Sequence, residues 1–580
     1  MSVQVSDPAI SGVVTFTVML NGNDVSGQFA ISNLIVQKEA NKISFARVSL
    51  FDGDVSTQDF AASNEDDMAP GAEVEILAGY NSEEVTLFKG IVTRQRVSAR
   101  SGMSGLLTLE CRNKAVATTI GRKSACFHEV TDSDAIEEIL SNYDLTPEVE
   151  ATEVEHKELV QYHATDWDFI LSRCEANGQL ILLDDDNFVT AMPDASKTPM
   201  LSVAYGSNIL EFEAETDARF QYAGVSNTAW SAADQEMIED EGDEPDLKDQ
   251  GDLPGTDLAD VIGLESYGML HAGQLPTEEL KAIASAQMLK SRLSRIIGRA
   301  TIQGNSDIKI GEFITLEGVG NRYNGDAFVT AIRQEISNGN WLTHIQFGLS
   351  AEWFTETTNI SQPPASGLLP AISGLHIGIV TQLQEDPDSE ERILVKIPAF
   401  DPEDEGLWAR VAKLDAGDSR GTIFNPEIDD EVLVGFLNDD PRNPVVLGML
   451  HSSAKPSPIE ASDDNHEKGI VTRDELKLLF NDDLKSIEVS TPNGNKVLLS
   501  DDEGGITLED ENGNKLVMSS DGISIESAKD LILKATGDVT AEGVNIGINA
   551  SAEFKAEGGA GAEVSTGAIA VLKGSLVQIN

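Results

Sequence analysis

The sequence predicts a mainly β protein with some α-helix, in which an N-terminal region of strands and helices leads to a small barrel and a C-terminal β needle. Short runs of alternating apolar and polar residues recur along most of the chain, separated by Gly, Asn or Asp. Apolar residues at helical spacing occur in only a few segments. The 580 residues are too many for one hydrophobic core, so several domains are expected.

The charge and the cysteine content exclude several classes of protein. The chain has 41 Lys and Arg against 98 Asp and Glu, which gives a formal net charge of −57. Such a surface repels nucleic acid and anionic membranes. The three scattered cysteines favour neither a disulfide framework nor a zinc site. The first residues do not resemble a signal peptide, so synthesis in the cytoplasm without one is expected.

Residues 1–365 are expected to form the hub. Antiparallel strands are predicted between residues 14 and 112, with Gly, Asn and Asp in the turns. A helix is predicted to start after Thr131 or Ser133, because apolar residues follow at helical spacing. The residues on its apolar face are Ala135, Ile136, Ile139 and Leu140.

Two more helices and one irregular segment are predicted in the hub. One helix spans 166–178 and leads into a hairpin at 180–192. The other starts at Thr277 and continues to about Gly298. Between them, the acidic stretch at about 232–263 is rich in Gly, Pro and Asp and is expected to be an exposed insertion or loop.

A barrel of the OB type is predicted at 374–452, because five short apolar runs fit into this stretch. The Pro, Gly and Ser content of 366–373 marks a linker before it. A connector at 453–485 follows the barrel. Within this connector, TRDE at 472–475 has the pattern of a capping box, which predicts a short helix.

Residues 486–580 are predicted to form the needle. Their apolar residues are small or medium aliphatics in short alternating runs, and the string NGNK occurs at 493–496 and at 512–515. One copy has too little apolar cover to enclose a core, whereas several identical chains around a shared axis could do so. The predicted core residues are Val497, Leu499, Ile506, Leu508, Leu516, Met518, Ile523, Ile525, Leu531, Leu533, Val544 and Ile546.

The order of hub, barrel and needle resembles VgrG-type spike proteins, which include the type VI secretion tip, the spike of extracellular contractile injection systems and the hub-spike fusion of contractile phage tails. The barrel sequence, with LWARV at 407–411 and NPEIDDEVLVGF at 425–436, is its most specific part. The residues of this OB signature, all expected to be structural, are Gly378, Val380, Trp408, Arg410, Pro426, Glu427, Val432, Val434, Phe436, Pro441, Pro444 and Gly448.

The resemblance implies a structural central spike rather than an enzyme. It implies a homotrimer in which two barrel-like subdomains per hub form a pseudo-sixfold ring, and in which the needle is an intertwined triple-stranded β-helix. The implied partners are the inner-tube hexamer, baseplate proteins, possible effector cargo and a PAAR-type tip protein. The residues expected to contact that cap are Leu576, Val577, Ile579 and Asn580.

The resemblance leaves the kind of machine open. A type VI secretion system, a free extracellular particle and a prophage tail share this architecture, with the extracellular particle slightly favoured. In each case the spike would be part of an injection particle, released or fired into a target cell, and would puncture its membrane. Two other functions remain as alternatives, namely an effector-bearing enzymatic spike and a glycan-binding, phage-like baseplate adhesin.

No catalytic, cofactor or metal site is predicted from the residues. Acidic clusters such as Asp184, Asp185 and Asp186 follow from the acidic composition and are expected in turns. No histidine occurs after His466, so a histidine metal site at the needle apex is excluded. Trp408 beside Arg410 is expected to be a barrel core residue next to a surface residue, rather than a ligand platform.

Overall fold

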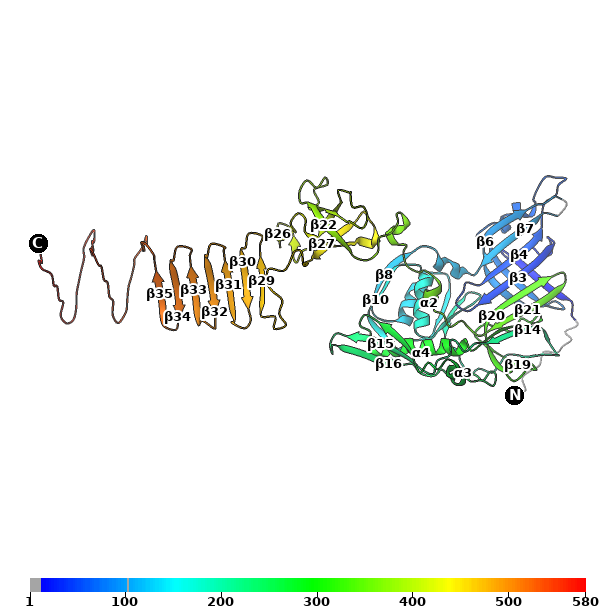
Figure 1. Ribbon diagram of the computed structural model, residues 1–580. Coiled ribbons are helices and arrows are strands. Elements are labelled where there is room, and N and C mark those ends of the chain that lie inside the picture. The colour runs from blue at the N-terminus through cyan, green and yellow to red at the C-terminus, as the bar shows by residue number, and fades with distance from the viewer. Residues whose placement is uncertain (1–11, 102–103, 580) are drawn as a thin grey trace. The chain divides into compact units, whose positions relative to one another are not determined.

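The computed structural model describes residues 12–101 and 104–579 and divides the chain into two compact units. The first unit is Met1–Ala371 and the second is Ile372–Asn580. The division falls inside the segment 366–373, which was expected to be a linker. Each unit is described by itself (Figure 1).

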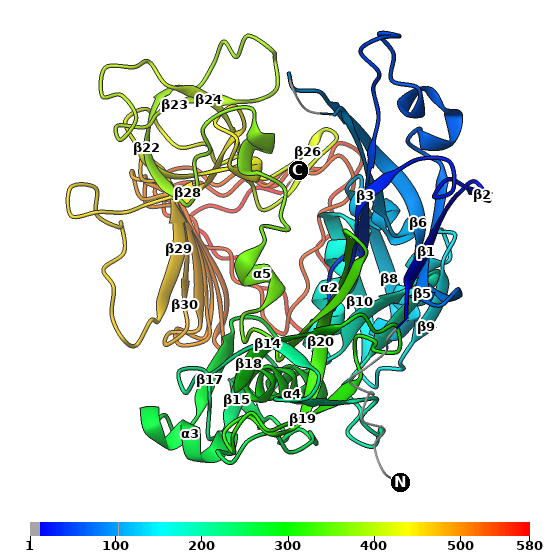
Figure 2. The ribbon, with the colours of Figure 1, turned by 90° about the vertical axis from the view of Figure 1, so that its right-hand side faces the viewer.

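The hub is built on a sheet of 13 strands, in which β20 pairs with β3 and so joins the N-terminal strands to the C-terminal ones. The path of the sheet is β14-β18-β21-β20-β3-β4-β7-β6-β5-β1-β2, and β19 pairs with β20 and β13 off this path. Figure 2 shows these strands from another side. The strands are β1 Val14–Leu20, β2 Asn23–Asp24, β3 Ile31–Glu39, β4 Phe45–Phe51, β5 Glu73–Tyr80, β6 Glu83–Ser98, β7 Leu106–Arg112, β13 Ser202–Ala204, β14 Ile209–Thr216, β18 Ile296–Gln303, β19 Phe313–Glu317, β20 Gly325–Ser337 and β21 Asn340–Phe347.

The two halves of this sheet have separate hydrophobic cores. One core includes Val48 and Leu109 from β4 and β7, and the other includes Ile302 and Phe347 from β18 and β21. Strand β20 is long enough to belong to both halves, because it pairs with β3, β19 and β21. The hub therefore consists of two halves with a core each, which share one continuous sheet.

Smaller sheets and helices complete the hub. Their strands are β8 Lys123–Thr131, β9 Thr146–Val149, β10 Glu155–Ala164, β11 Leu180–Asp184, β12 Asn187–Ala191, β15 Val225–Ser231, β16 Glu236–Glu241 and β17 Tyr267–His271. The α-helices are α1 Asp132–Leu140, α2 Asp166–Ala176, α3 Gly255–Ile262, α4 Thr277–Leu293 and α5 Phe354–Thr357.

The predicted helices α1 and α2 are confirmed, with their ends fixed by side-chain caps. Thr131 and Asp134 form the capping box of α1, and Thr165 caps α2. The prediction for α4 was wrong at its C-terminus, because Ile296 to Gly298 belong to β18. This strand pairs with β14 and β21, and the two ladders outweigh the helical spacing of its first residues.

The acidic segment 232–263, expected to be an exposed insertion or loop, is not a simple loop. Residues 236–241 form β16, which pairs with β15, and residues 255–262 form α3. Gly263 ends α3 with a φ of 74°, a conformation that glycine adopts without strain. Strand β16 lies at the edge of a three-stranded sheet, and its residues Glu236, Glu239 and Glu241 are exposed.

The second unit begins with a closed five-stranded barrel of order β22-β23-β24-β28-β27, as the sequence predicts. Its core is aliphatic and includes Val380, Val395 and Val434. A short hairpin of β25 and β26 interrupts the chain between β24 and β27. The strands are β22 His376–Gln382, β23 Ile393–Lys396, β24 Leu407–Val411, β25 Ala416–Gly417, β26 Arg420–Gly421, β27 Glu431–Phe436 and β28 Pro444–Met449.

A meander of seven antiparallel strands follows the barrel (Figure 1). In the view of Figure 2 these strands lie behind β29 and β30, so the sheet is a single layer. The strands are β29 Glu467–Val471, β30 Lys477–Asn481, β31 Ser486–Ser490, β32 Lys496–Ser500, β33 Gly505–Glu509, β34 Lys515–Ser519 and β35 Gly522–Glu526.

The short helix predicted from TRDE at 472–475 was wrong. These residues form the turn between β29 and β30, where Thr472 accepts hydrogen bonds from Leu476 and Glu475 through its side chain and backbone. Pairing of Ile470 with Leu478 extends the sheet through this region. The hydrogen bonds that β30 forms with β29 and β31 therefore outweigh the local capping pattern, which takes no account of these neighbouring strands.

A buried group of charged side chains holds α1, α2, β10 and α4 together in the hub. The Asp132 carboxylate accepts hydrogen bonds from Arg173 Nη2 at 3.0 Å and from Asn177 Nδ2 at 2.8 Å, and it lies 3.2 Å from His156 Nε2. Arg173 also donates to Glu279 of α4 at 3.0 Å. Burial opposes ionisation of Asp132, but the contacts with His156 and Arg173 outweigh it and hold its pKa well below the usual range.

We expect Asp132→Asn to destabilise the hub by about 3 kcal/mol at neutral pH, because Arg173 would lose its buried counter-charge. Since the pKa of Asp132 is lowered on folding, its contribution is present above the unfolded-state pKa of about 3.9 and is lost as the pH falls below it. Calorimetry of the full chain at pH 7 and at about pH 3 measures both effects.

The matched control is Glu137→Gln, an exposed position of the same helix, which should change stability by less than about 0.5 kcal/mol. Equal unfolding temperatures for the two variants at pH 7 would contradict the assigned role of Asp132.

Candidate oligomer interface

The acidic cluster of Asp184, Asp185 and Asp186 contacts lysines of the hub. Asp184 contacts Lys38 Nζ at 2.7 Å and Lys309 Nζ at 2.9 Å. Burial opposes ionisation of Asp184, but the two lysines outweigh it and lower its pKa to about 2. Both contacts join the β11–β12 hairpin to the large sheet, which is a structural role. The described residues contain no group of three or more His, Cys, Asp or Glu side chains placed to hold a metal ion.

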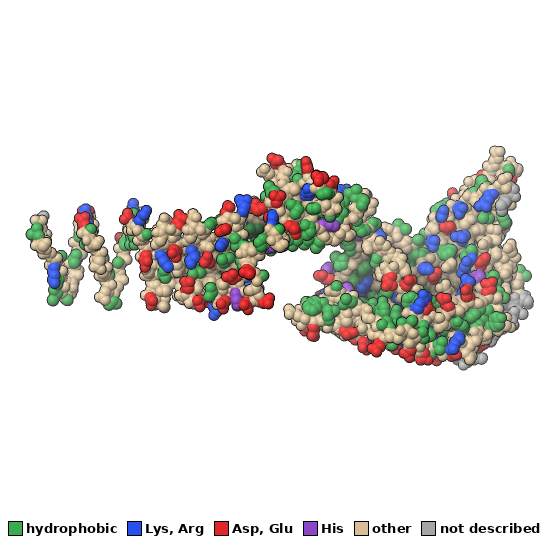
Figure 3. Space-filling model, in the orientation of Figure 1, with side chains coloured by type: hydrophobic (Ala, Val, Ile, Leu, Met, Phe, Trp, Pro, Cys, Tyr) green, Lys and Arg blue, Asp and Glu red, His purple; other side chains and the backbone are tan. Residues whose placement is uncertain are grey.

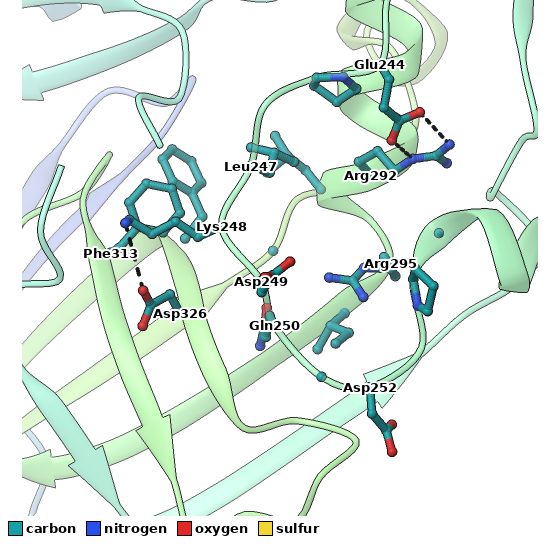
Figure 4. A pocket seen from close by; sticks show the side chains of 18 residues that line it. Glu244, Leu247, Lys248, Asp249, Gln250, Asp252, Arg292, Arg295, Phe313 and Asp326 are labelled. Atoms are coloured by element: carbon teal, nitrogen blue, oxygen red, sulfur yellow. Dashed lines mark hydrogen bonds and ion pairs between the residues drawn. The ribbon is translucent and has the colours of Figure 1, made fainter. Parts of the chain in front are cut away.

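A cavity of about 320 Å³ lies in the hub between the segment 244–255, α4 and β18 (Figure 4). Two pairs of charged side chains at its wall attach this segment to the hub. Arg292 donates to both oxygens of Glu244, at 2.5 and 2.8 Å, and Lys248 lies 3.9 Å from Asp326. The cavity is therefore the space under an attached segment, and it presents no arrangement of groups for catalysis.

Strands β30–β35 of the seven-stranded sheet have one continuous apolar face, which we call face A. Cross-strand partners lie on the same face of an antiparallel sheet, so the register assigns each side chain to a face. The first row of face A is Leu478, Val489, Val497, Leu508, Leu516 and Ile525, and the second row is Phe480, Ile487, Leu499, Ile506, Met518 and Ile523.

No segment among the described residues covers face A. Val489 is 50% exposed, Leu499 is 43% exposed and Ile525 is 53% exposed. A groove of about 640 Å³ follows the first row and has the turns 491–495 and 510–514 along its side. A folded protein rarely leaves such a long apolar surface in water, so face A has the character of an interface.

The predicted needle core residues fall into two sets in the structure. Val497, Leu499, Ile506, Leu508, Leu516, Met518, Ile523 and Ile525 all lie on face A. Leu531, Leu533, Val544 and Ile546 lie in residues 527–579, where no strand or helix occurs and all four side chains are exposed. The sequence did not predict that face A starts at Leu478 and Phe480. A helix was expected there, so the alternation of side chains between the two faces of a strand was not recognised.

Residues 527–579 form an extended path without any described backbone–backbone hydrogen bond of their own (Figure 1). Their apolar side chains are also uncovered, as Val564 at 92% and Ile569 at 83% exposure show. Backbone groups without partners and open aliphatic side chains together make this segment dependent on other chains. Of the residues expected to contact a cap, Leu576, Val577 and Ile579 are exposed, and Asn580 lies outside the described residues.

The residues of the OB signature divide between the core and the surface of the barrel. Val380, Val432 and Val434 are fully buried, and Pro426 and Pro444 are buried as well. Phe436 packs against the core. Glu427 is exposed and accepts a hydrogen bond from Arg473 at 2.9 Å, and Pro441 and Gly448 lie at partly buried positions.

Trp408 was wrongly expected in the barrel core. In β24 the side chains of Leu407, Ala409 and Val411 face the core, and Ala409 is fully buried. Trp408 and Arg410 alternate with them and therefore lie on the outer face, with Trp408 half-buried and Arg410 exposed. The alternation of side chains along β24 predicts the outward position of Trp408, whereas the size of its side chain suggested the core.

No helix among the described residues has both the length and the apolar character needed to cross a bilayer. The surface visible in Figure 3 carries many acidic side chains, which agrees with the net charge of −57.

Models of three protein families match successive parts of the chain. The Alg8 N-terminal domain matches residues 10–338. The type VI secretion system/phage-baseplate injector OB domain matches residues 376–451, which include the closed barrel. The phage baseplate V C-terminal trimerisation domain matches residues 486–580. The sheet described above starts two strands before this third match, at β29.

Curated relatives match over short stretches only. The type VI secretion system spike protein VgrG4b of Pseudomonas aeruginosa is 34% identical over 111 residues, which are 17% of this chain and 13% of that protein. The corresponding spike protein VgrG3 of Vibrio cholerae is 30% identical over 113 residues, which are 18% of this chain and 11% of that protein. The chain therefore matches only about an eighth of the length of these relatives.

Among solved structures, the tail protein from Neisseria meningitidis MC58 is similar to part of the chain. The TM-score is 0.43 at 13% identity, and the similarity covers 59% of this chain and 98% of that chain.

We expect Gly378→Ala to destabilise the barrel by about 2 kcal/mol, because its inward position has no room for a side chain. An added Cβ would lie 2.4 Å from Val395 Cγ1 and 3.0 Å from Val434 Cγ2. The control is Gly448→Ala, where nothing lies within 4 Å of the added atom. Urea unfolding of the full chain, followed by hydrogen exchange of barrel peptides, compares the two, and equal protection in both variants would refute the packing argument.

Proposed function

Because the chain belongs to the VgrG and phage-baseplate spike family, we propose that it is the central spike that joins the hexameric inner tube of a contractile injection machine to a trimeric needle. The needle would be driven forward on contraction and would open the target envelope. The observation that carries this proposal is face A, an open apolar surface within a segment that matches a trimerisation domain.

Three copies arranged around a common axis would bury face A of each sheet. Each sheet would form one wall of a prism, and the two rows of aliphatic side chains would fill its interior. The transfer of one Val, Leu, Ile, Phe or Met side chain out of water contributes about 2 kcal/mol, so twelve such positions per chain would stabilise the assembly strongly. Residues 527–579 would obtain their missing hydrogen-bond partners from the neighbouring copies.

The hub is suited to connect threefold and sixfold symmetry. Each copy has one sheet with two halves and two cores, so three copies would present six similar halves to a hexameric tube. We assign the contacts with the tube and with other baseplate proteins to the hub on this basis.

The family domains that match residues 376–451 and 486–580 are structural spike and baseplate domains, and no catalytic domain is identified there. We infer a mechanical role, in which strand pairing between copies resists bending. The exposed Leu576, Val577 and Ile579 would offer a small apolar platform to a PAAR-type tip protein. The spike would act as part of an injection particle outside the producing cell or within the target envelope.

We expect the full chain to sediment as a trimer, and Ile525→Asp to raise the dissociation constant of the trimer at least about a hundredfold. This side chain would lie in the closed interior, where an unpaired carboxylate is costly. The control is Ser524→Asp, the next residue on the same strand, which lies on the other face and should leave the trimer intact.

Analytical ultracentrifugation over a range of protein concentrations measures these constants. A monomeric wild-type chain would refute the trimeric spike. A trimer that tolerates Ile525→Asp as well as Ser524→Asp would show that face A is not its interior.

A further inference from the structure

The seven-stranded sheet repeats a pattern of charges every nineteen residues. Lys477, Lys496 and Lys515 are the first residues of β30, β32 and β34. Asp483, Asp502 and Asp521 lie six positions after each lysine, in the turns that follow these same strands. Face A needs aliphatic side chains only, so the packing of its interior does not explain this second repeat.

The lysines and the aspartates lie at opposite edges of the sheet. Lys477 pairs with Ser490, Ser490 with Lys496, Lys496 with Glu509, and Glu509 with Lys515. The three lysines therefore share one row at one edge, on the face opposite to face A. Each aspartate lies in a turn at the other edge, because its strand has crossed the sheet in between.

Most of these lysines and aspartates form no ion pair within one copy. In the described part of the chain, Lys477 and Lys496 form no ion pair, and neither do Asp483, Asp502 and Asp521. Lys515 is 3.8 Å from Glu509 of its own row. Lys468 pairs with Asp482, the residue before Asp483, and leaves Asp483 exposed. Figure 3 shows basic and acidic side chains side by side along this sheet.

A threefold arrangement brings unlike edges together. In a ring of three copies the contacts are head to tail, so the lysine edge of each sheet meets the aspartate edge of the next. Symmetry places equivalent residues of all copies at the same height along the axis. Since each aspartate follows its lysine after a single strand, the two differ in height by less than the spacing of about 4.8 Å between strands.

We propose that the register of neighbouring copies in the needle is set by intermolecular ion pairs, in which Lys477, Lys496 and Lys515 of one copy face Asp483, Asp502 and Asp521 of the next. This inference rests on the trimer proposed above and adds the interaction that aligns its three chains. The aliphatic rows of face A distinguish registers poorly, because similar side chains recur on every strand. A slip by one strand would move each lysine away from its turn and lose every pair at once.

Charge reversal in the full chain tests the pairing. Lys496→Asp and Asp502→Lys are each expected to raise the dissociation constant of the trimer about tenfold, measured by sedimentation at a fixed urea concentration in low salt. The double variant, with both changes in every copy, restores opposite charges and should return to within about twofold of the wild type. In 1 M NaCl, where the screening length is about 3 Å, the differences should largely disappear.

The control is Glu488→Lys, in the middle of the same face and away from both edges, which should leave the constant unchanged. Two weakened single variants without recovery in the double variant would overturn the pairing, as would single variants that bind like the wild type. A wild-type chain that is monomeric would instead refute the proposed function, so the two failures are distinguishable.

A crosslinking experiment reads the register directly. In a Cys126→Ser background, which removes the exposed cysteine, Lys496→Cys combined with Asp502→Cys should give covalent trimers with a short bis-maleimide. Lys496→Cys combined with Asp521→Cys, one repeat further along, should give few. Equal or stronger crosslinking of the second pair, or crosslinking of neither pair in an intact trimer, would refute the proposed register.

Discussion

The burial of face A is the interaction on which the needle depends. A single sheet can satisfy its backbone hydrogen bonds in a meander, and β29–β35 do so over seven strands. The same sheet cannot bury both of its faces, and face A bears twelve apolar side chains in two unbroken rows. Hydrophobic burial is the largest favourable contribution to folding, so a structure that leaves this face in water is incomplete. Copies of the chain would supply the missing cover.

The hub and the barrel differ from the needle because each closes its core within one chain. The barrel needs only about eighty residues, since its strands return to their starting point and leave no edge. The hub uses one long strand, β20, to connect two cores, and it fixes its helices with the buried contacts of Asp132 and Arg173. Such charged contacts contribute little net stability, but their loss leaves a buried charge without a partner, so they restrict the helices to one arrangement.

The sequence predicts the class of fold, the barrel and the face of the needle strands because all three depend on local alternation. Val497 and Leu499, for example, alternate with polar residues and lie together on face A. The errors occur where pairing with other strands, rather than the local pattern, determines the secondary structure. Ile296 to Gly298 continue a helical pattern but pair with β14 and β21, and Leu478 follows a capping pattern but pairs with β29 and β31. The charge repeat at the sheet edges could be seen in the sequence, but its meaning depends on the register.

The extended state of residues 527–579 implies an order of events in biosynthesis. This segment has no ladder of its own, so its folding must wait until chains have met, and its rate must depend on chain concentration. The seven-stranded sheet already aligns the copies next to it, which makes the remaining pairing effectively intramolecular and lowers its entropic cost. The needle would thus assemble progressively, starting with the seven-stranded sheet, and residues 527–579 would become ordered last.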